Sequence, residues 1–431
     1  MSSEWQTVLL GDVAELSGGY AFKSEEYTES GHFVLRTVNI TDDGRIDRRG
    51  ATFVSLEAAR KYERFALKPF DTLFVMVGAT LGKTGFVKTQ DLPALLNQNM
   101  WLIRAKPSLI SPLYLHYAFK VFSQPLLGMA SGSARGFVKR DDFRQMIIPL
   151  PSAPEQVRIS SLLGALDDRI TLLRETNATL EAIAQALFKS WFVDFDPVRA
   201  KQEGRAPEGM SDATAALFPD SFEESELGLV PKGWRVGTLG DVAQTARQQM
   251  QVSDLHADLH YVGLEHIPRK SLSLTAWGNA EGLESAKAAF SEGDILFGKL
   301  RPYFHKVVIA PFSGVCSTDI LVCQPRTKAY FGLVAMHLFS ETLIEYADRL
   351  SNGAKMPRVN WKDLAAYPIC IPPTDVATEL NEAIHPLVAR MNANTHQAQT
   401  LATLRDTLLP RLISGQLRLP EAEALIEEAT A

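Results

Sequence analysis

An internal duplication is the feature of this 431-residue chain that most restricts its fold. Four pairs of short segments match in the same order and at a nearly constant separation along the chain. They are WQTVLLGDVA (5–14) with WRVGTLGDVA (234–243), FDTLF (70–74) with GDILF (293–297), SGSARGFVKRDDF (131–143) with NGAKMPRVNWKDL (352–364), and IPLP (148–151) with ICIP (369–372). Chance supplies a single short match far more readily than an ordered set, so we expect two related structural units.

The first part of each copy has the pattern of a mixed α/β domain. Short runs rich in β-branched and aromatic residues, such as FVLRTVNI (33–40) and DTLFVMVG (71–78), are separated by turn residues. A helical pattern lies between such runs, for example over 111–122. Residues 1–150 and 232–372 are therefore each predicted to form an α/β domain, and their length is usual for a domain.

A long helix is predicted after the first domain, within residues 151–195. Ser152 and Glu155 have the spacing of a capping box, and Pro154 suits the first helical turn. Downstream, apolar residues recur at heptad spacing in two rows, which is the pattern of a coiled-coil seam with one polar position. The first row is Leu166, Leu173, Leu180 and Leu187, and the second is Leu163, Ile170, Asn177, Ala184 and Trp191.

A second helix of similar length is predicted within residues 373–416. Its seam again has two rows, Leu380, Leu387, Asn394, Leu401 and Leu408 in one, and Ile384, Met391, Ala398, Arg405 and Leu412 in the other. Pro386 lies inside this pattern and is expected to kink or break the helix, because proline removes a backbone donor and clashes with the preceding turn. Gly415 and Pro420 are typical of a helix end.

The two helices are predicted to pair with each other as an antiparallel coiled coil. They have about the same length, and each carries a central asparagine in its seam, Asn177 in the first and Asn394 in the second. Heptad patterns of this length favour a helical partner, and the duplication would relate the two halves by a pseudo-twofold axis. The alternative is that each helix packs only on its own domain.

Two further segments are predicted to carry little core. Residues 196–231 begin within VDFDPVRAKQEGRAPEGM, which is rich in Pro, Gly and charge, and are expected to form a linker. Residues 417–431 are expected to form a solvated acidic tail, because they carry Glu421, Glu423, Glu427 and Glu428.

Composition excludes several classes of protein. No run approaches the roughly 20 apolar residues that a membrane-spanning helix needs, and residues 1–5 show no leader pattern, so a cytoplasmic protein is predicted. The three cysteines, Cys316, Cys323 and Cys370, lack the spacing of a disulfide framework or a zinc site. The net charge of −6 conceals a mild excess of base in both α/β domains, which permits DNA binding without proving it.

Three short motifs imitate catalytic or metal sites and are rejected. Three residues separate Gly78 from Gly82, where a Walker A loop has four. His256 and His260 have ligand spacing but lack the following glutamate of a zinc protease. The segment SGSARG at 131–136 lacks the spacing of a hydrolase nucleophile. We also find no Asn-Pro-Pro-aromatic methyltransferase tetrapeptide, so no catalytic or metal site is predicted in this chain.

The segment order and five sequence tags resemble the specificity subunits of type I restriction–modification systems. The tags are IPLPSAPEQVRI (148–159), LFKSWFVDFDPVRAK (187–201), PKGWRVGTLGDVA (231–243), YVGLEHI (261–267) and LLPRLISGQL (408–417). The resemblance covers nearly the whole chain. One departure is that the second copy has Val376-Ala377 where the first has Glu155-Gln156, so the copies differ where partner docking is expected.

The resemblance implies a non-catalytic, DNA-binding subunit of an adenine methyltransferase and endonuclease complex. Each α/β domain would be a target-recognition domain that reads one half of a bipartite, asymmetric site in double-stranded DNA. The paired helices would set the unread gap between the half-sites. The resemblance also implies docking of two methyltransferase subunits, which bring S-adenosylmethionine, and of a motor–nuclease restriction subunit, which brings ATP. No cofactor is expected in this chain itself.

Polar and basic residues at predicted strand ends and loops are the candidates for DNA contact, since phosphate contacts position a protein and base-edge contacts give specificity. They are Lys23, Arg36, Lys83, Asn97, Gln98, Asn99, Arg135 and Lys139 in the first domain, and Arg301, Lys306, Lys355 and Arg358 in the second. Because the loops of the two domains differ strongly, the two half-sites are expected to differ as well.

Two other functions remain open on the sequence. A polypeptide with its own methyltransferase or nuclease site would act on DNA without a partner subunit. A coiled-coil scaffold that binds only proteins would not retain DNA.

Overall fold

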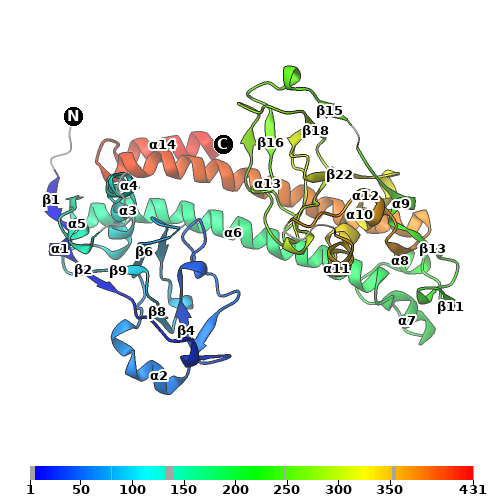
Figure 1. Ribbon diagram of the computed structural model, residues 1–431, viewed down its shortest axis with the longest axis horizontal. Coiled ribbons are helices and arrows are strands. Elements are labelled where there is room, and N and C mark those ends of the chain that lie inside the picture. Colours follow the sequence, from blue (N-terminus) through cyan, green and yellow to red (C-terminus); the bar gives the residue numbers. More distant parts are fainter. Residues whose placement is uncertain (1–4, 79, 132–138, 247, 352–355, 431) are drawn as a thin grey trace. The chain divides into compact units, whose positions relative to one another are not determined.

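The computed structural model divides into two compact units. The first unit contains residues 1–168 and 400–431, and the second contains residues 169–399, so each holds one α/β domain and parts of both long helices (Figure 1). The structure describes residues 5–78, 80–131, 139–246, 248–351 and 356–430.

The first α/β domain lies within the first unit and alternates short strands with short helices. Its strands are β1 (Gln6–Leu9), β2 (Ala14–Gly18), β3 (Tyr27–Thr28), β4 (His32–Leu35), β5 (Thr52–Val54), β6 (Thr72–Val75), β7 (Thr84–Phe86), β8 (Ala94–Leu96), β9 (Met100–Ala105) and β10 (Ile147–Leu150). Its helices are α1 (Leu10–Val13), α2 (Leu56–Lys61), α3 (Pro112–Phe122), α4 (Gln124–Ser131) and α5 (Arg140–Arg144).

Two four-stranded sheets build this domain, in the orders β2-β9-β6-β7 and β3-β5-β4-β8. Strand β6 is buried along its whole length, because its two faces pack on different neighbours. Leu73 and Val75 join a cluster with Phe33 of the second sheet. Phe74, on the other face, makes edge-on ring contacts with Phe119 of α3 and Phe143 of α5. The core of the domain therefore lies on both sides of the first sheet.

The second α/β domain lies within the second unit. Its strands are β13 (Arg235–Thr238), β14 (Ala243–Thr245), β15 (Gln249–Met250), β16 (His260–Val262), β17 (Gly278–Asn279), β18 (Lys287–Phe290), β19 (Ile295–Gly298), β20 (Val307–Ile309), β21 (Gly314–Cys316), β22 (Ile320–Pro325) and β23 (Pro368–Ile371). Its helices are α9 (Leu239–Val242), α10 (Phe331–Phe339), α11 (Glu341–Leu350) and α12 (Trp361–Ala365).

The second domain repeats the scaffold of the first. Its four-stranded sheet has the order β14-β22-β19-β20, which matches β2-β9-β6-β7 strand for strand, and the ladder β13–β23 repeats β1–β10. Strand β19 is fully buried, like β6. A five-stranded sheet in the order β15-β18-β21-β16-β17 takes the place of the second sheet. The predicted fold class, two repeated α/β domains with two long helices, is confirmed.

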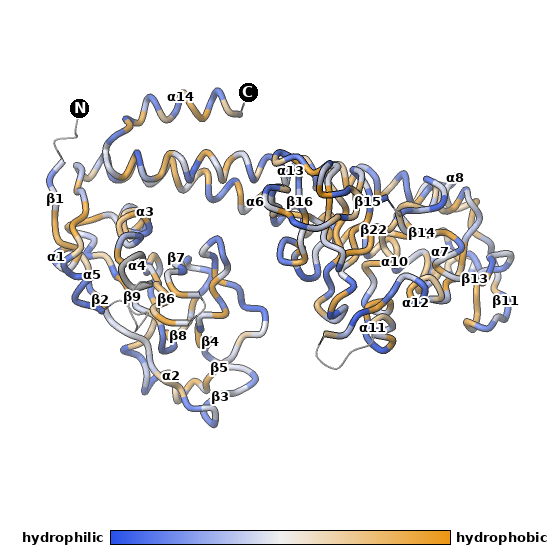
Figure 2. The backbone as a smooth tube through the Cα atoms, turned by 45° about the horizontal axis from the view of Figure 1, so that its top comes forward, coloured by the Kyte–Doolittle hydropathy of each residue, from blue (hydrophilic) through white to orange (hydrophobic). Residues whose placement is uncertain are grey.

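The long helices are α6 (Ala153–Phe192) and α13 (Thr374–Ile413), each of 40 residues. Hydrophobic and hydrophilic residues alternate along both of them (Figure 2), as expected for helices that bury one stripe. Within the second unit, Asn177 Nδ2 donates to the Met391 carbonyl at 3.0 Å and to Thr395 Oγ1 at 3.1 Å. Asn394 Nδ2 donates to Asn177 Oδ1 at 2.9 Å. The two seam asparagines thus bond to each other across the helix pair.

The helix pair of the first unit has an ion pair in its seam. Arg405, whose side chain is 11% exposed, donates to Asp167 at 2.6 Å, and Asp167 also accepts from the Tyr117 hydroxyl at 2.7 Å. Arg418, just beyond α13, lies 3.6 Å from Glu155 near the start of α6. The residue numbers of the partners therefore increase along one helix as they decrease along the other, so the two helices run antiparallel.

Burial of the predicted seam residues follows the heptad pattern in part. The buried ones are Leu163, Leu166, Ile170, Leu173, Asn177, Ala184, Trp191, Leu380, Ile384, Met391, Asn394, Ala398, Leu401, Leu408 and Leu412. The half-buried ones are Leu180, Leu187 and Leu387, which pack at the edge of the large core cluster of the second unit.

The break expected at Pro386 is wrong, because α13 continues through this residue as one helix. Pro386 lies on an exposed face, and Glu382, whose carbonyl loses its helical partner there, is also exposed. Water can therefore satisfy the freed carbonyl, which removes the hydrogen-bonding part of the cost of a proline inside a helix.

The prediction that residues 196–231 form a linker with little core is also wrong. It forms helices α7 (Asp196–Gln202) and α8 (Asp212–Ala216) and the hairpin of β11 (Phe222–Ser225) with β12 (Gly228–Pro231). Val198 and Phe218 are almost fully buried, and the Phe218 ring meets that of Trp191 edge-on at 5.3 Å. Apolar residues scattered among charges thus contribute to the main core of the second unit.

The acidic tail expected at 417–431 is largely the helix α14 (Leu419–Thr430). Its glutamates are exposed as predicted, but Leu417, Leu419 and Ala422 are buried. The segment therefore packs on the first unit through one apolar face, and the count of glutamates concealed that face.

Candidate nucleic-acid interface

The loop between β19 and β20, residues 299–306, is the most cationic and aromatic hairpin of the second domain. Its sequence is KLRPYFHK, with no carboxylate. Arg301 and His305 have φ of 52° and 51°, so the loop turns sharply at both residues. Tyr303 at the tip is 49% exposed. A cationic loop with an exposed ring suits contact with both phosphates and bases.

The segment that carries Arg358 lies against this loop through backbone hydrogen bonds. Arg301 N–H donates to the Pro357 carbonyl at 2.8 Å, and Val359 N–H donates to the Lys299 carbonyl at 3.1 Å. Leu300 and Arg358 form an antiparallel bridge between the two segments. Two predicted DNA-contact residues, Arg301 and Arg358, are therefore brought together although they are distant in sequence.

Lys306, the third predicted contact in this loop, is less available. Its ammonium group donates to the Leu264 carbonyl. Burial and the nearby Arg269 lower the pKa of Lys306, and Glu265 opposes that shift. Lys306 therefore holds the loop against residues 264–269 as well as adding positive charge.

The equivalent hairpin of the first domain, residues 76–83, joins β6 to β7 and has the sequence MVGATLGK. Lys83 donates to Asp42 at 2.7 Å and to the Ile40 carbonyl at 3.1 Å, and its side chain is 19% exposed. Met76 N–H donates to the Asn99 carbonyl at 3.0 Å. Asn99 is exposed and has φ of 71°, so it sits at a tight turn beside the hairpin.

The other predicted residues of the first domain converge only in part. Asn97 N–H donates to the Leu35 carbonyl at 3.0 Å, and Gln98 N–H donates to the Tyr20 carbonyl at 2.8 Å. Arg36 follows directly after Leu35, so Arg36, Asn97, Gln98 and Asn99 lie at neighbouring strand ends. Four of the predicted contacts thus form one local group.

Lys23 and Lys139 are exposed and precede short helices at other points of the first domain. Lys23 Nζ is 3.7 Å from Glu25. The backbone N–H of Lys139 donates to Asp142 at 3.0 Å. Arg135 and Lys355 lie outside the described residues. Contact with DNA stays a prediction for all of these residues.

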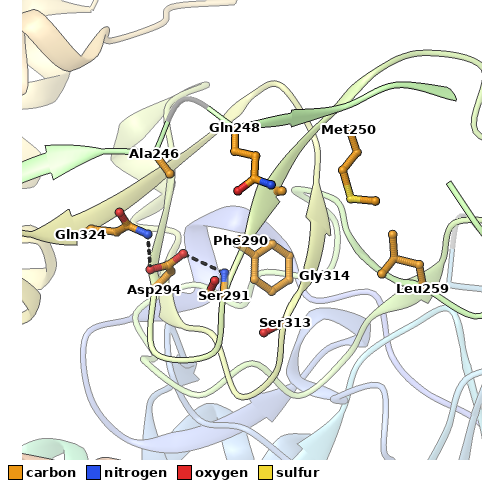
Figure 3. Close-up of a pocket in the computed structure, with 11 residues that line it drawn as sticks. Ala246, Gln248, Met250, Leu259, Phe290, Ser291, Asp294, Ser313, Gly314 and Gln324 are labelled. Atoms are coloured by element: carbon orange, nitrogen blue, oxygen red, sulfur yellow. Dashed lines mark hydrogen bonds between the residues drawn. The ribbon is translucent and has the colours of Figure 1, made fainter. Parts of the chain in front are cut away.

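A cavity of about 240 Å³ lies in the second domain among β15, β18, β21 and β22 (Figure 3). Asp294 accepts hydrogen bonds there from Ser291 N–H and from Gln324 Nε2, each at 2.8 Å. Burial raises the pKa of Asp294, and these two hydrogen bonds oppose the rise. The bonds brace the turn before β19, and no predicted DNA-contact residue lines the cavity, so it lies outside the candidate interface.

The described parts of the chain offer little to a metal ion. No group of three or more His, Cys, Asp or Glu side chains converges among the described residues. His260 of the rejected histidine pair belongs to β16, and its ring lies 4.3 Å from that of Phe312. The three cysteines are free and buried, and burial raises the pKa of the Cys370 thiol to about 11. None of the helices in the described segments has the length and apolar character needed to cross a membrane.

Comparison with protein families assigns both copies. The model of the type I restriction modification DNA specificity domain matches residues 2–182 and, a second time, residues 231–402. The chain belongs to this family. The MjaIX specificity subunit of Methanocaldococcus jannaschii is 25% identical over 97% of this chain and 94% of its own length. The EcoDI specificity subunit of Escherichia coli is 24% identical over 96% of this chain and 89% of its own length.

The fold of the type I specificity family is shared as well. The crystal structure of the specificity subunit from M. genitalium has a TM-score of 0.58 at 13% identity and covers 95% of this chain and 96% of its own. The predicted membership and the non-catalytic role in DNA recognition are confirmed by the family match and by relatives named as specificity subunits. The matched domain is named for DNA specificity, and these relatives are named as subunits of type I restriction enzymes.

Three residues of the candidate interface were not selected from the sequence: Lys299, Tyr303 and Asp319. Lys299 and Tyr303 belong to the hairpin whose Arg301 and Lys306 were selected, so extending the choice to the whole loop would have included them. Asp319 precedes β22 as Asn99 precedes β9, and the repeat could have paired them. The matching backbone bonds, Lys299 N–H to Asp319 and Met76 N–H to Asn99, each at 3.0 Å, confirm that the two positions are equivalent.

Proposed function

We propose that this chain reads a bipartite, asymmetric DNA site, with one half-site contacted by each α/β domain. The observation that carries the proposal is that the two copies of the DNA specificity domain each have a four-stranded sheet of the same strand order. The two sheets differ in the loops at their strand ends. Sequence readout needs side chains that reach base edges, and those side chains differ between the hairpins at 76–83 and 299–306. Two half-sites of different sequence follow.

The paired helices are proposed to act as the spacer that sets the unread gap. Hydrogen bonds or ion pairs cross the helix pair within each unit, Asn177 with Asn394 in one and Asp167 with Arg405 in the other. Each domain is also bonded to a helix. The Tyr117 hydroxyl donates to Asp167 in the first unit, and Leu272 N–H donates to Glu181 at 2.6 Å in the second. Such contacts favour a rigid spacer over a flexible tether.

The partners of the complex are proposed to be two methyltransferase subunits and one motor–nuclease subunit. S-adenosylmethionine would bind the methyltransferase subunits and ATP the motor, with no cofactor in this chain. In the described residues the side chains at the candidate interface are mainly basic, amide and aromatic, which are groups suited to DNA contact, and the carboxylate of Asp319 among them pairs with Arg358. The helix pair, which repeats with the domains, would offer two related docking surfaces.

Reconstitution tests this division of labour. Purified chain, purified methyltransferase partner and their mixture are each incubated with DNA and labelled S-adenosylmethionine. We expect site-specific methyl transfer only from the mixture. Methyl transfer by the chain alone would show that it holds its own active site. A mixture that methylates DNA identically with and without the chain would show that the chain supplies no specificity.

A heptad insertion tests the spacer. Seven residues placed between Asp168 and Arg169 and seven between Gln399 and Thr400, at the boundaries of the two units, keep the heptad register of both helices. They add about 10 Å to the helix pair, which is about three base pairs along B-DNA. We expect the gap of the methylated site to lengthen by about three base pairs with both half-sites unchanged. An unchanged gap would contradict the spacer role.

A further inference from the structure

Arg358 of the second domain is held on both its backbone and its side chain. Its neighbours Pro357 and Val359 are bonded to the hairpin at 299–306. Its guanidinium group donates from Nε to Asp319 Oδ1 at 2.9 Å and from Nη2 to Asp319 Oδ2 at 3.4 Å. The Arg358 side chain is nevertheless 47% exposed. An arginine that is fixed in place and exposed to solvent is prepared for contact with a partner.

Asp319 is itself fixed by its own backbone. Its carbonyl accepts from Lys299 N–H at 3.0 Å, and its N–H donates to Ser317 Oγ at 3.3 Å. The Asp319 side chain is 27% exposed. An exposed ion pair contributes below about 1 kcal/mol to stability, so stability alone gives little reason for this arrangement. Its geometric effect on Arg358 is larger, because it removes rotamer freedom that a free arginine would lose on binding.

The edge of the guanidinium that Asp319 leaves open has two parallel N–H donors. Asp319 uses the edge formed by Nε and Nη2, so the edge formed by Nη1 and Nη2 faces away from it. Among the residues that the structure describes, none accepts a hydrogen bond from Nη1. Guanine is the base whose major-groove edge presents two acceptors, O6 and N7, at matching spacing. Adenine and cytosine present a donor there, and thymine presents one acceptor beside a methyl group.

We propose that Arg358, oriented by Asp319, recognises a guanine in the half-site read by the second domain. The inference rests on the proposed function and names one base contact within it. Arg358 is the specificity-determining residue, and Asp319 is a positioning residue that acts through it. The contact is bidentate, from the open edge of Arg358 to O6 and N7 of the base.

A phosphate is the other acceptor that a guanidinium commonly binds. The carboxylate of Asp319 makes the pair electrically neutral and would lie close to any phosphate bound at the open edge, where it would repel that anion. A base edge carries no net charge and is not repelled. The ion pair therefore favours the base over the backbone.

The first domain lacks this device. Asn99 stands at the position of Asp319, and in the repeat alignment Phe137 stands at the position of Arg358. An amide has one acceptor oxygen and no charge, so it could not hold a guanidinium group as Asp319 does. The guanine contact is thus expected in one half-site only, which agrees with an asymmetric site.

A base-analogue experiment on the whole complex tests the proposal. Each guanine of the methylated target is replaced in turn by 7-deazaguanine, which lacks the N7 acceptor, and binding of the chain with its methyltransferase partners is measured. We expect one position at which wild type loses affinity about 10- to 100-fold. Arg358→Ala should lose a similar factor on the natural target and should show no further loss with the analogue at that position.

Two further variants separate positioning from structure. Asp319→Asn keeps the size of the side chain and should reduce affinity for the natural target by a smaller factor than Arg358→Ala, and the analogue should then cost this variant less affinity than it costs wild type. Arg235→Ala is the matched control, because Arg235 also pairs with an aspartate of the second unit, Asp241 at 3.4 Å, and is 60% exposed. It should retain the full sensitivity to 7-deazaguanine.

The outcomes distinguish this inference from the proposed function. Wild-type complex that shows no sequence-specific binding would contradict the proposed function itself. Specific binding in which no guanine analogue acts through Arg358 would overturn the inference alone, as would a target without guanine. If Arg358→Ala weakens target and unrelated DNA equally and lowers the salt dependence by about one charge, Arg358 binds a phosphate and the inference is wrong.

Discussion

The hairpin of the first domain and that of the second join equivalent strands but differ in almost every loop residue. MVGATLGK at 76–83 is glycine-rich and its Lys83 is tied to Asp42, whereas KLRPYFHK at 299–306 presents arginine and tyrosine. The strands before them, β6 and β19, are both fully buried. Burial on two faces restricts which side chains a strand tolerates, whereas an exposed loop tolerates many different side chains. The two copies therefore have the same sheet with hairpins of different chemistry.

The second sheets show that the scaffold also tolerates rewiring. In the first domain β5 pairs with β4, and β4 pairs in parallel with β8. In the second domain the parallel pair is β16 with β21, and the remaining long strand, β18, pairs with β21 instead. Both copies have the parallel pair. The additional strand pairs with the first strand of that pair, β4, in the first domain and with the second strand, β21, in the second domain. The main sheet and this parallel pair are thus the shared elements of the fold.

The seam between α6 and α13 also has different polar contacts in the two units. The second unit buries an amide pair, Asn177 with Asn394, and the first places an ion pair, Asp167 with Arg405, in its seam. Both choices satisfy polar groups that would otherwise be costly to bury. The following mutations test whether the two units pack equivalently despite these different polar contacts.

The largest effect is expected from Leu163→Ala and Ile384→Ala. These residues occupy the same position in α6 and α13, and both are fully buried. Each substitution should cost about 2–5 kcal/mol, because it leaves a cavity. Hydrogen exchange followed by mass spectrometry should show lost protection mainly in the unit that holds the residue. Leu172→Ala, on an exposed part of α6, is the control. Equal loss of protection in both units would contradict their independent packing.

A smaller effect is expected at the asparagine pair. Asn177→Ala leaves the Asn394 amide without its acceptor in the seam and removes one of the donors to the Met391 carbonyl, so it should cost about 1–3 kcal/mol. The double change Asn177→Leu and Asn394→Leu replaces both partners by apolar groups and should be close to neutral. Urea unfolding of wild type, Asn177→Leu, Asn394→Leu and the double variant measures the coupling. Additive costs would show that the two amides do not depend on each other.

The pattern of heptads explains why the helix pair was predictable and the segments around it were not. Periodic leucines identify α6 and α13 and place Asn177 opposite Asn394, because a repeated spacing sums over many residues. Phe218 and Ala422 are single apolar residues among charges, so their burial depends on a tertiary partner that local pattern does not reveal. Asp319 was missed for a similar reason, since its contact with Arg358 joins two residues that are distant in sequence.

The pH dependence of stability should be modest and should involve His337 of the second domain. Burial lowers the pKa of His337 to about 3, against about 6.5 in an unfolded chain. Between these values the unfolded chain binds a proton that the folded chain does not, so stability is full above pH 6.5 and falls as the pH is lowered.

His337→Leu should remove this contribution, which is on the order of 2 kcal/mol at pH 5. His116 lies at the equivalent position of α3, bonded through Nδ1 to Thr72 Oγ1 at 3.2 Å, and burial lowers its pKa to about 3 as well. His116→Leu is therefore the matched test in the first domain. Urea unfolding at pH 7.5 and pH 5 measures both. Identical acid sensitivity of wild type and both variants would show that neither histidine governs it.

The smallest effect is expected at exposed ion pairs. Lys88 pairs with Asp168 at 2.9 Å in the first unit, and Lys270 pairs with Glu341 at 2.7 Å in the second. Lys88→Ala and Lys270→Ala should each change the free energy of unfolding by below about 1 kcal/mol, because water screens both pairs. A larger loss from either would show that its helix contact is more dehydrated than its exposure indicates.

The most direct measurement of the central claim is a genome-wide map of methylated adenines in cells that carry this chain with its methyltransferase partner. We expect one two-part motif whose halves differ in sequence and are separated by a gap of fixed length. A single uninterrupted motif, or two identical inverted halves, would contradict the reading of one distinct half-site by each copy.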